Sequence, residues 1–326
     1  MSTPVFGVMH DFRQLLPWRI PVADYYAECL DLIAEAENLG YESVWLSEHH
    51  GTADGFLPSP LVAAAAIAAR TSRIRIGTNV LLLPLHHPIR VAEDVAVADL
   101  VSGGRMMLGV GQGYAPEEFE LLGIDRRHRP SRFEEGIQII RTALRDGRTG
   151  LNGRRFRIPD GRFALISEMP IHIGATGGPA LDRAVRLGDG LLSYVAEPGQ
   201  LHQRYADYHA ALERAGRPPA TFPFSWTSIC HVAADAETAW SEAAPGIAYL
   251  ESALRRDALT ADDLDPTEYL VGSPVDVARR LVEAHERSPF DRFAFWSRLP
   301  GLTRAQASAA QARFAAEVVP RFSAHR

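Results

Sequence analysis

The chain has 326 residues, of which 46% are hydrophobic and 23% are charged, and its formal net charge at pH 7 is −6. This is the composition of a globular protein with enough apolar side chains for a large core, and it excludes a disordered chain. The net negative charge excludes a basic surface for nucleic acid or for an anionic membrane, so we expect a small-molecule partner.

The first half of the chain repeats a short apolar strand followed by an amphipathic helix. The expected strands are 5–9, 43–46, 74–77 and 106–110, and the expected helices are 23–39, 60–70 and 89–100. Gly40 and the pair Gly103-Gly104 are typical helix stops, and Pro60 is a typical helix start. Four such units in a row indicate parallel strands with helical connections.

The second half continues the repeat less regularly. We expect a helix at 132–145, a surface hairpin at 150–158, and strands at 171–173, 191–194, 224–232 and 293–296. Residues 234–268 do not fit the repeat and are predicted to be an inserted helical segment. Ser273-Pro274 after it is typical of a helix N-cap followed by proline at the first position.

The repeat and the absence of a linker rich in Pro, Gly or Ser predict one domain over residues 1–326, a (β/α)8 TIM barrel with insertions. An open, doubly wound sheet is the alternative. The longest wholly apolar run, 61–69, is too short to span a bilayer, and 1–19 lacks the layout of a secretory signal, so we expect a cytoplasmic protein. Cys29 and Cys230 are expected to be buried thiols.

All 34 cationic side chains are arginines, because the chain contains no lysine. Schiff-base and pyridoxal-phosphate mechanisms need a lysine amine and are therefore excluded. Arginine cannot act as a base at neutral pH, so proton transfer falls to other side chains or to a cofactor.

Glu48, His49 and His50 directly follow the second expected strand, which places them at the catalytic rim of a barrel. They could be metal ligands, acid/base groups, or polar loop residues. The chain has no His-x-His and no helical His-Glu-x-x-His spacing that would supply further ligands, so we expect no metal and favour acid/base chemistry. A second pair, His86-His87, could equally well bond loop carbonyls.

Two glycine-rich segments follow later strands, 109–113 after the fourth and 174–179 after the fifth. Glycine allows backbone N–H groups to approach an anion, and a helix starting near Pro179 would direct its positive end at a phosphate. The second segment is thus the better phosphate candidate, although glycine is also common at tight turns after strands.

Taken together, these segments resemble the luciferase-like monooxygenase family. The resemblance covers nearly the whole chain and is densest at 40–50, 76–78, 83–84, 87–94, 102–105 and 271–274. It implies a (β/α)8 barrel that holds reduced FMN, or the deazaflavin F420 in some branches, at the carboxyl ends of its strands. It also implies a homodimer.

The resemblance also assigns site residues. His49 matches the histidine beside the flavin that assists the oxygen chemistry, with Glu48 or His50 expected to hold it in place. The cofactor-binding positions that it implies are Asn79 and Val80 at a non-prolyl cis peptide bond under the flavin ring, Gln112, Gly113 and Tyr114 along the flavin, and Ala175, Thr176, Gly177 and Gly178 as the phosphate loop.

Two departures from bacterial luciferase bear on the cofactor. Gln112 stands where luciferase has an arginine, and Thr176-Gly177 stands where it has a Glu-Ser pair, which weakens charge-based phosphate binding. The Gly177-Gly178 loop looks like those of F420-dependent relatives. The Glu-His-His segment instead looks like the oxygen-using members, and on that ground we favour FMN.

The sequence therefore predicts a two-component monooxygenase that takes reduced FMN from a separate flavin reductase and uses O2 on a small apolar organic substrate. The alternatives are F420-dependent hydride transfer without oxygen, a flavin-binding protein with little catalysis, and, last, a metal-dependent hydrolase. Five aromatic side chains are expected near the strand ends, where they would either form an apolar pocket or belong to the core: Phe6, Tyr114, Tyr194, Trp226 and Trp296.

Overall fold

A computed structural model describes residues 4–15 and 20–324 of the chain. Its central strands are β1 (Val5–His10), β2 (Ser43–Leu46), β3 (Arg75–Thr78), β5 (Met106–Gly111), β8 (Ile171–Gly174), β9 (Gly190–Tyr194), β10 (Phe224–Ser228) and β13 (Arg292–Trp296). All of their pairings are parallel, in the order β3-β2-β1-β13-β10-β9-β8-β5, and a pairing between β3 and β5 closes the ring. The predicted eight-stranded barrel is thus confirmed, and the open sheet is wrong.

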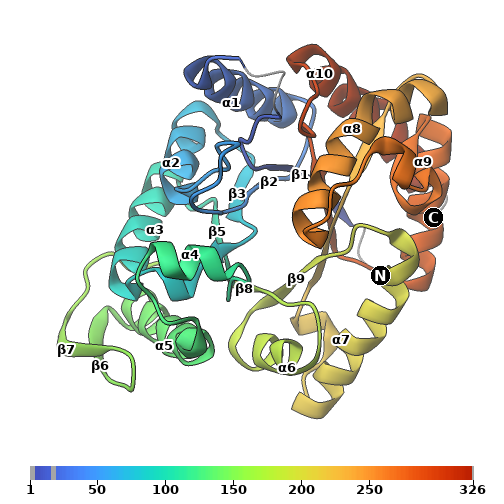
Figure 1. The fold of residues 1–326 in the computed structure, drawn as a ribbon. Helices are drawn as coiled ribbons and strands as arrows, with labels where there is room; N and C mark the ends of the chain where they lie inside the picture. Colours follow the sequence, from blue (N-terminus) through green and yellow to red (C-terminus); the bar gives the residue numbers. More distant parts are fainter. Residues whose placement is uncertain (1–3, 16–19, 325–326) are drawn as a thin grey trace.

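Helices surround the barrel (Figure 1). They are α1 (Val22–Asn38), α2 (Pro60–Arg70), α3 (Pro88–Ser102), α4 (Pro116–Leu121), α5 (Arg129–Asp146), α6 (Gly178–Leu187), α7 (Leu201–Ala215), α8 (Ala236–Arg255), α9 (Pro274–Arg287), α10 (Arg304–Arg313) and α11 (Val319–Ala324). Gly103 ends α3 in the left-handed conformation, at φ 70°, as its predicted role requires. Within the described ranges, no helix is long and apolar enough to cross a membrane.

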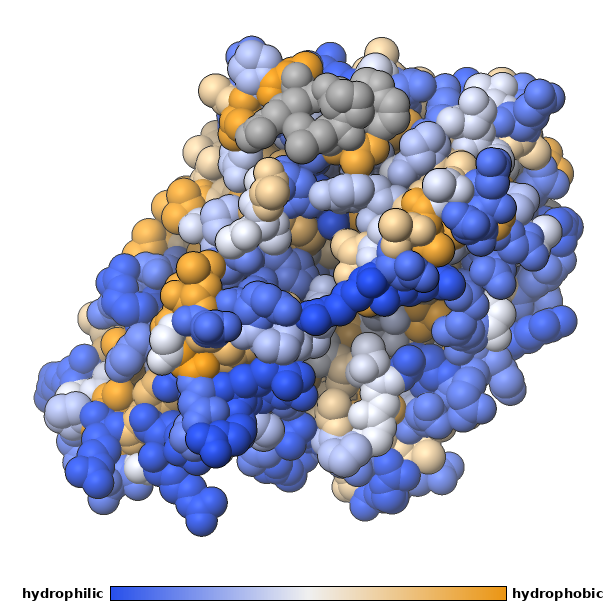
Figure 2. All heavy atoms as spheres, in the orientation of Figure 1, coloured by the Kyte–Doolittle hydropathy of each residue, from blue (hydrophilic) through white to orange (hydrophobic). Residues whose placement is uncertain are grey.

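The outer faces of α2 and α3 expose apolar side chains, and the two helices pack against each other. Val62 of α2 is 72% exposed, and Val97 and Val101 of α3 are 49% and 51% exposed. Figure 2 shows hydrophobic side chains along the side of the molecule where these two helices lie. An apolar face of this kind is a feature of interaction surfaces.

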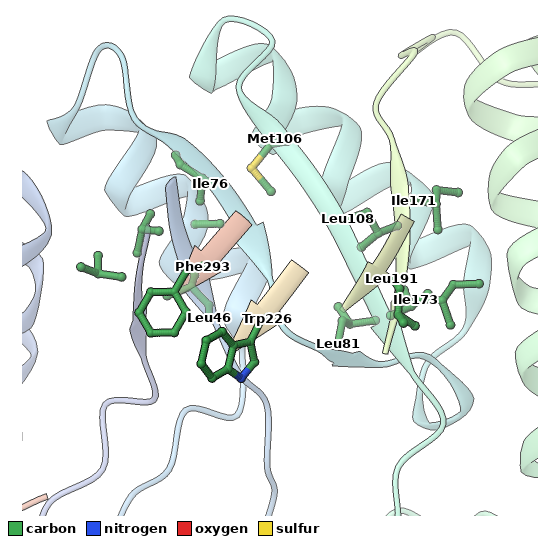
Figure 3. Packing of buried hydrophobic residues seen from close by; sticks show 14 of the residues in the cluster. Leu46, Ile76, Leu81, Met106, Leu108, Ile171, Ile173, Leu191, Trp226 and Phe293 are labelled. Atoms are coloured by element: carbon green, nitrogen blue, oxygen red, sulfur yellow. The ribbon is translucent and has the colours of Figure 1, made fainter. Parts of the chain in front are cut away.

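Successive residues of each strand point to opposite sides of the barrel wall. In β2, Val44 and Leu46 pack into the outer layer between strands and helices, whereas Trp45 fills the interior, where a Cβ on Gly77 would lie 2.5 Å from its ring. The outer layer is shown in Figure 3. Both cysteines, Cys29 and Cys230, are buried in it, as predicted.

Two of the five aromatic residues expected at the rim belong instead to the outer layer. The ring of Phe6 packs 5.6 Å from that of Phe314, and the fully buried Trp226 packs 4.9 Å from Phe293. Their strand positions point outward, towards the helices, so of the two alternatives the core holds for Phe6 and Trp226, and neither lines a pocket.

The expected single strand at 224–232 is also wrong. It is divided at Ile229 into β10 and β11 (Cys230–Val232), and β11 leaves the barrel to pair with β12 (Leu270–Gly272). Both pieces are fully buried, and the stretch contains no glycine, proline, asparagine or aspartate that would mark the break. The inserted helical segment is confirmed as α8, and the surface hairpin as β6 (Arg148–Asn152) and β7 (Arg157–Arg162).

The loop expected at 79–88 contains short ordered elements, β4 (Leu81–Leu82) and η1 (Leu83–Leu85). β4 adds to the edge of β5 beyond the point where β3 ends. This pairing draws the 79–88 segment over the carboxyl end of the barrel, next to the segment that follows β2.

Candidate active site

The segments that follow the barrel strands bring the predicted residues of the site together at one end of the barrel. Glu48 is the most buried of them, at 1% exposure. One carboxylate oxygen, Oε1, lies 2.7 Å from His50 Nε2 and 2.6 Å from His86 Nε2, and the other accepts a hydrogen bond of 2.6 Å from the Leu82 backbone N–H. Glu48 therefore ties the segment after β2 to the segment after β3.

The charge of Glu48 is fixed by these contacts. Burial by itself would raise its pKa, but the hydrogen bonds from His50, His86 and Leu82 and the charge of His86 outweigh burial and lower the pKa to about 2. The hydrogen bond to Glu48 in turn raises the pKa of His50. A carboxylate and an imidazolium at this distance form a half-buried ion pair.

His49 has a different partner. Its Nδ1 lies 2.7 Å from Oε1 of Glu118, which also accepts a hydrogen bond of 2.8 Å from the His50 backbone N–H. Glu118 belongs to α4 and is only 3% exposed. The His49 ring is flanked by Phe56 and Tyr114, with ring centroids 4.6 Å and 5.5 Å away.

The expectation that Glu48 or His50 holds His49 is thus wrong. Residues two apart on an extended segment point to the same side, so Glu48 and His50 face each other while His49 between them faces the opposite way. No helix was predicted at α4, and so its buried acid was missed. A glutamate in a short acidic segment after the 109–113 glycines was the only available signal.

The peptide bond between Asn79 and Val80 is cis, as the resemblance implied. Asn79 Nδ2 donates a hydrogen bond of 2.8 Å to Thr227 Oγ1 across the barrel. Val80 lies against two glycines at neighbouring strand ends, because a Cβ on Gly111 or on Gly174 would come within 2.4 Å or 2.7 Å of its methyl groups. The valine thus occupies the room that these glycines leave open.

Gln112, Gly113 and Tyr114 follow β5 and are accessible from outside. Gly113 has φ 72°, and its carbonyl accepts a hydrogen bond of 3.1 Å from Arg129. Tyr114 is 53% exposed, so its ring covers His49 from the solvent side. These positions are consistent with contact to a bound molecule at the mouth.

The expected phosphate loop leads from β8 into α6. Ala175 is buried, Thr176 is exposed, Gly177 is the N-cap of α6, and Gly178 has φ 48°. Arg204 of α7, which sequence reasoning missed, lies beside this loop: its Nη1 would be 3.4 Å from a Cβ on Gly177. Its Nε is buried and has no hydrogen-bond partner in the described chain.

Glu48, His50 and His86 also have ligand atoms within 4.8 Å of one another, a spacing that a shared metal ion could use. The short contacts from both histidines to one carboxylate oxygen satisfy these atoms as hydrogen bonds. The expectation of no metal stays a prediction.

The sequence profile described as luciferase-like monooxygenase matches residues 6–292. Among curated relatives, limonene 1,2-monooxygenase of Rhodococcus erythropolis is 29% identical over 76% of this chain and 67% of its own. The F420-dependent glucose-6-phosphate dehydrogenase of Kineococcus radiotolerans is 32% identical over 57% of this chain and 58% of its own. The chain spans only 46% and 40% of the first two curated relatives, both uncharacterised proteins of Sinorhizobium fredii.

Among solved structures, the monooxygenase RslO1 of Streptomyces bottropensis has a TM-score of 0.86 and 23% identity, with 98% of this chain and 99% of that chain covered. The oxygenating constituent of 3,6-diketocamphane monooxygenase of Pseudomonas putida, in complex with FMN, has a TM-score of 0.81 and 18% identity, with 98% of each chain covered. At these identities the likeness shows the fold.

Proposed function

The chain belongs to the luciferase-like monooxygenase family, and from that membership we propose that it is a two-component monooxygenase that uses reduced FMN and O2 on a small apolar organic substrate. The observation that carries the proposal is the pair formed by His49 and Glu118 at the barrel mouth, 2.7 Å apart. We also propose that residues 1–326 act as one domain, because the described helices pack around a single barrel.

The residues at the mouth fit a flavin. Val80, seated against Gly111 and Gly174, offers an apolar support for a flat ring system. The loop at Gly177 and Gly178, with the unpartnered Nε of Arg204 beside it, offers backbone N–H groups and a positive charge for a phosphate. We propose that Asn79, Val80, Gln112, Gly113 and Tyr114 line the ring, and that Ala175, Thr176, Gly177, Gly178 and Arg204 bind the phosphate.

When bound, reduced flavin supplies the electrons that activate molecular oxygen. The protein supplies the imidazole of His49, held in one orientation by Glu118. A carboxylate can only accept a hydrogen bond, so Glu118 places the His49 proton on Nδ1 and leaves Nε2 free to accept a proton. Phe56 and Tyr114 fix the plane of the ring.

Glu48 has a different part in this proposal. It remains charged at neutral pH and holds His50 and His86, so it keeps the segments after β2 and β3 in register at the mouth. We therefore propose Glu48 and His50 as positioning residues and His49 as the catalytic one.

A direct experiment separates the cofactor hypotheses. Purified protein is titrated with FMN and with F420, with and without competing inorganic phosphate, and binding is followed by absorbance and fluorescence. Reduced FMN is then supplied by a flavin reductase, and its reoxidation by oxygen is followed by stopped-flow absorbance. We expect FMN to bind, and His49→Ala to slow the reoxidation about a hundredfold or more while it leaves FMN affinity nearly unchanged. Unchanged reoxidation in that variant, with FMN bound, contradicts the assignment.

F420-dependent hydride transfer is the second candidate. The Gly177-Gly178 loop favours it, and one curated relative is an F420-dependent dehydrogenase. Binding of F420 in preference to FMN, without oxygen-dependent turnover, would replace the first proposal. Flavin binding without any turnover would indicate a flavin-binding protein instead.

We further propose that two copies of the chain associate through α2 and α3. Val62, Val97 and Val101 form an exposed apolar strip there, and Arg90 and Asp94 on the same face of α3 form an ion pair of 2.7 Å. An apolar strip beside charged residues is the composition of a protein interface.

A further inference from the structure

Arg13 is nearly buried at the barrel mouth, yet only part of its guanidinium is in use. Its side chain is 9% exposed, and its Nε donates a hydrogen bond of 2.8 Å to Asp11 Oδ2. In the described part of the chain, neither terminal nitrogen of Arg13 has a hydrogen-bond acceptor. A guanidinium offers several N–H groups in a fixed plane, so the two terminal nitrogens of Arg13 leave donors available at the mouth. This side chain is therefore poised to donate to a bound molecule.

The surroundings of Arg13 connect it to the candidate catalytic residue. Its Cζ lies 4.5 Å from the ring centroid of Phe56, and the same ring lies 4.6 Å from that of His49. On the other side, Asp11 Oδ2 accepts a hydrogen bond of 2.8 Å from Trp296 Nε1. Arg13 thus lies between the segment after β2 and the end of β13.

The walls around this donor are aromatic. The Trp296 ring packs 5.5 Å from Tyr194, at the end of β9, in an edge-to-face arrangement. Phe56 closes the side towards His49. The mouth therefore offers apolar ring surfaces and, at one point, the N–H donors of Arg13. Such a site suits an apolar molecule that carries a single polar group.

The local charge indicates what kind of polar group fits. Asp11 already neutralises Arg13 through their ion pair. Asp54, whose carboxylate accepts a hydrogen bond of 2.7 Å from Tyr249, is joined to the same segment by its backbone carbonyl, 3.0 Å from the Gln14 N–H. The formal charge of Arg13, Asp11 and Asp54 is −1, so a carboxylate ligand would meet repulsion, whereas a neutral oxygen would not.

We propose that Arg13 determines substrate specificity by donating hydrogen bonds to a neutral carbonyl oxygen of an apolar, ring-containing substrate. The inference rests on the proposed function, because it names the substrate class of that site. A donor that holds the oxygen also holds the rest of the molecule against the aromatic walls, on the side of Phe56 that His49 shares.

The test uses three probes of one shape: 2-acetylnaphthalene as the ketone, 2-isopropenylnaphthalene as the hydrocarbon, and 2-naphthoate as the carboxylate. Equilibrium dialysis against the full chain measures the affinity of each. We expect the ketone to bind about tenfold more tightly than the other two, which is the effect of one hydrogen bond to a charged donor. Equal or undetectable binding of all three, or a preference for the carboxylate, overturns the proposal.

Two variants assign the preference to Arg13. Arg13→Met should lower ketone affinity to that of the hydrocarbon while it leaves hydrocarbon binding within about threefold. Arg13→Lys can keep the ion pair with Asp11 but lacks the planar fork, so it should lose most of the preference even if Arg13→Met does not fold. The exposed Arg127→Met is the matched control and should bind all probes as the unaltered protein does. A ketone preference retained in both Arg13 variants overturns the proposal.

FMN titration of the same samples distinguishes failure of the Arg13 proposal from failure of the proposed function. Intact FMN binding without a ketone preference contradicts the role of Arg13 alone. A ketone preference that depends on Arg13, in a protein that binds neither FMN nor F420, supports the site and contradicts the proposed function.

Discussion

Glu118 Oε1 lies 2.7 Å from Nδ1 of His49, although the two residues are 69 positions apart in the chain. The contact exists because α4, which follows β5, places its buried acidic side chain against the segment that follows β2. A buried carboxylate that orients a histidine fixes both the ring and the position of its proton.

The first prediction concerns this pair. Glu118→Gln should slow the reoxidation of bound reduced FMN by about tenfold to a hundredfold, because the amide no longer requires the proton on Nδ1. Nitrogen-15 chemical shifts of His49 should show the Nδ1–H tautomer in the unaltered protein and a mixture in the variant. The exposed neighbour variant, Glu117→Gln, should leave both readouts unchanged. The same tautomer in Glu118→Gln as in the unaltered protein would show that Glu118 does not position His49.

The second prediction concerns the buried ion pair of Glu48. Its pKa is lowered from 4.5 to about 2, so the stability that it contributes is complete above about pH 4.5 and is lost as the pH falls through about 2. The shift corresponds to about 3 kcal/mol in the free energy of unfolding. Urea unfolding of Glu48→Gln should show this deficit at pH 6, and the deficit should shrink below pH 4.5.

For His50, the contribution to stability changes with pH in the opposite direction. Its pKa is raised, so its contribution is complete below its ordinary value of 6.5 and is lost as the pH rises through the raised value. The deficit of Glu48→Gln should therefore be largest between about pH 4.5 and about pH 6.5. Glu93→Gln, at a half-exposed acid on α3 that pairs with Arg90, serves as the control. A deficit of Glu48→Gln that does not vary with pH would contradict the ion pair.

The third prediction concerns the room beside Val80. A Cβ on Gly111 would come within 2.4 Å of a Val80 methyl group, so Gly111→Ala must displace the valine. We expect a loss of about 1–3 kcal/mol in the free energy of unfolding and about tenfold weaker FMN binding. Gly199→Ala, at a position with nothing within 4 Å, is the control for both measurements. Unchanged FMN affinity in Gly111→Ala would remove Val80 from the cofactor site.

The fourth prediction concerns Arg204. If its unpartnered Nε faces the cofactor phosphate, Arg204→Gln should weaken FMN binding about tenfold and leave riboflavin binding unchanged, since riboflavin has no phosphate. Fluorescence titration of both flavins measures the difference. Arg214→Gln, on the same helix but paired with Asp182, is the control. Equal weakening of both flavins would indicate a structural role for Arg204.

The fifth prediction concerns association of the chain. Val97→Asp places a charge in the middle of the apolar strip on α3 and should convert a dimer into a monomer, as measured by sedimentation velocity. Val275→Asp, on the exposed side of α9, should not alter the sedimentation coefficient. A dimer that tolerates Val97→Asp must use another face of the molecule.

Much of the barrel could be predicted because its signal is local. Short apolar runs followed by helices, with glycine and proline at the helix ends, are visible in the order of residues, and seven of the eight barrel strands lie where the sequence predicted them. The exception, β10, was joined to β11 because the stretch that they share contains no glycine or proline to mark a break. The placement of Glu48, His49 and His50 at the strand end followed from the same local pattern.

The partners within the site were decided by the tertiary structure alone. Glu118 faces His49, His86 joins Glu48, and Arg204 reaches Gly177 only because the closed ring brings the ends of distant strands to one mouth. The sequence determined which segments end at that mouth. Which side chains contact each other depends on the register between strands and on the alternation of side chains across the barrel wall. Contacts between segments far apart in the sequence arise only when the barrel closes, so the spacing of residues along the chain does not reveal them.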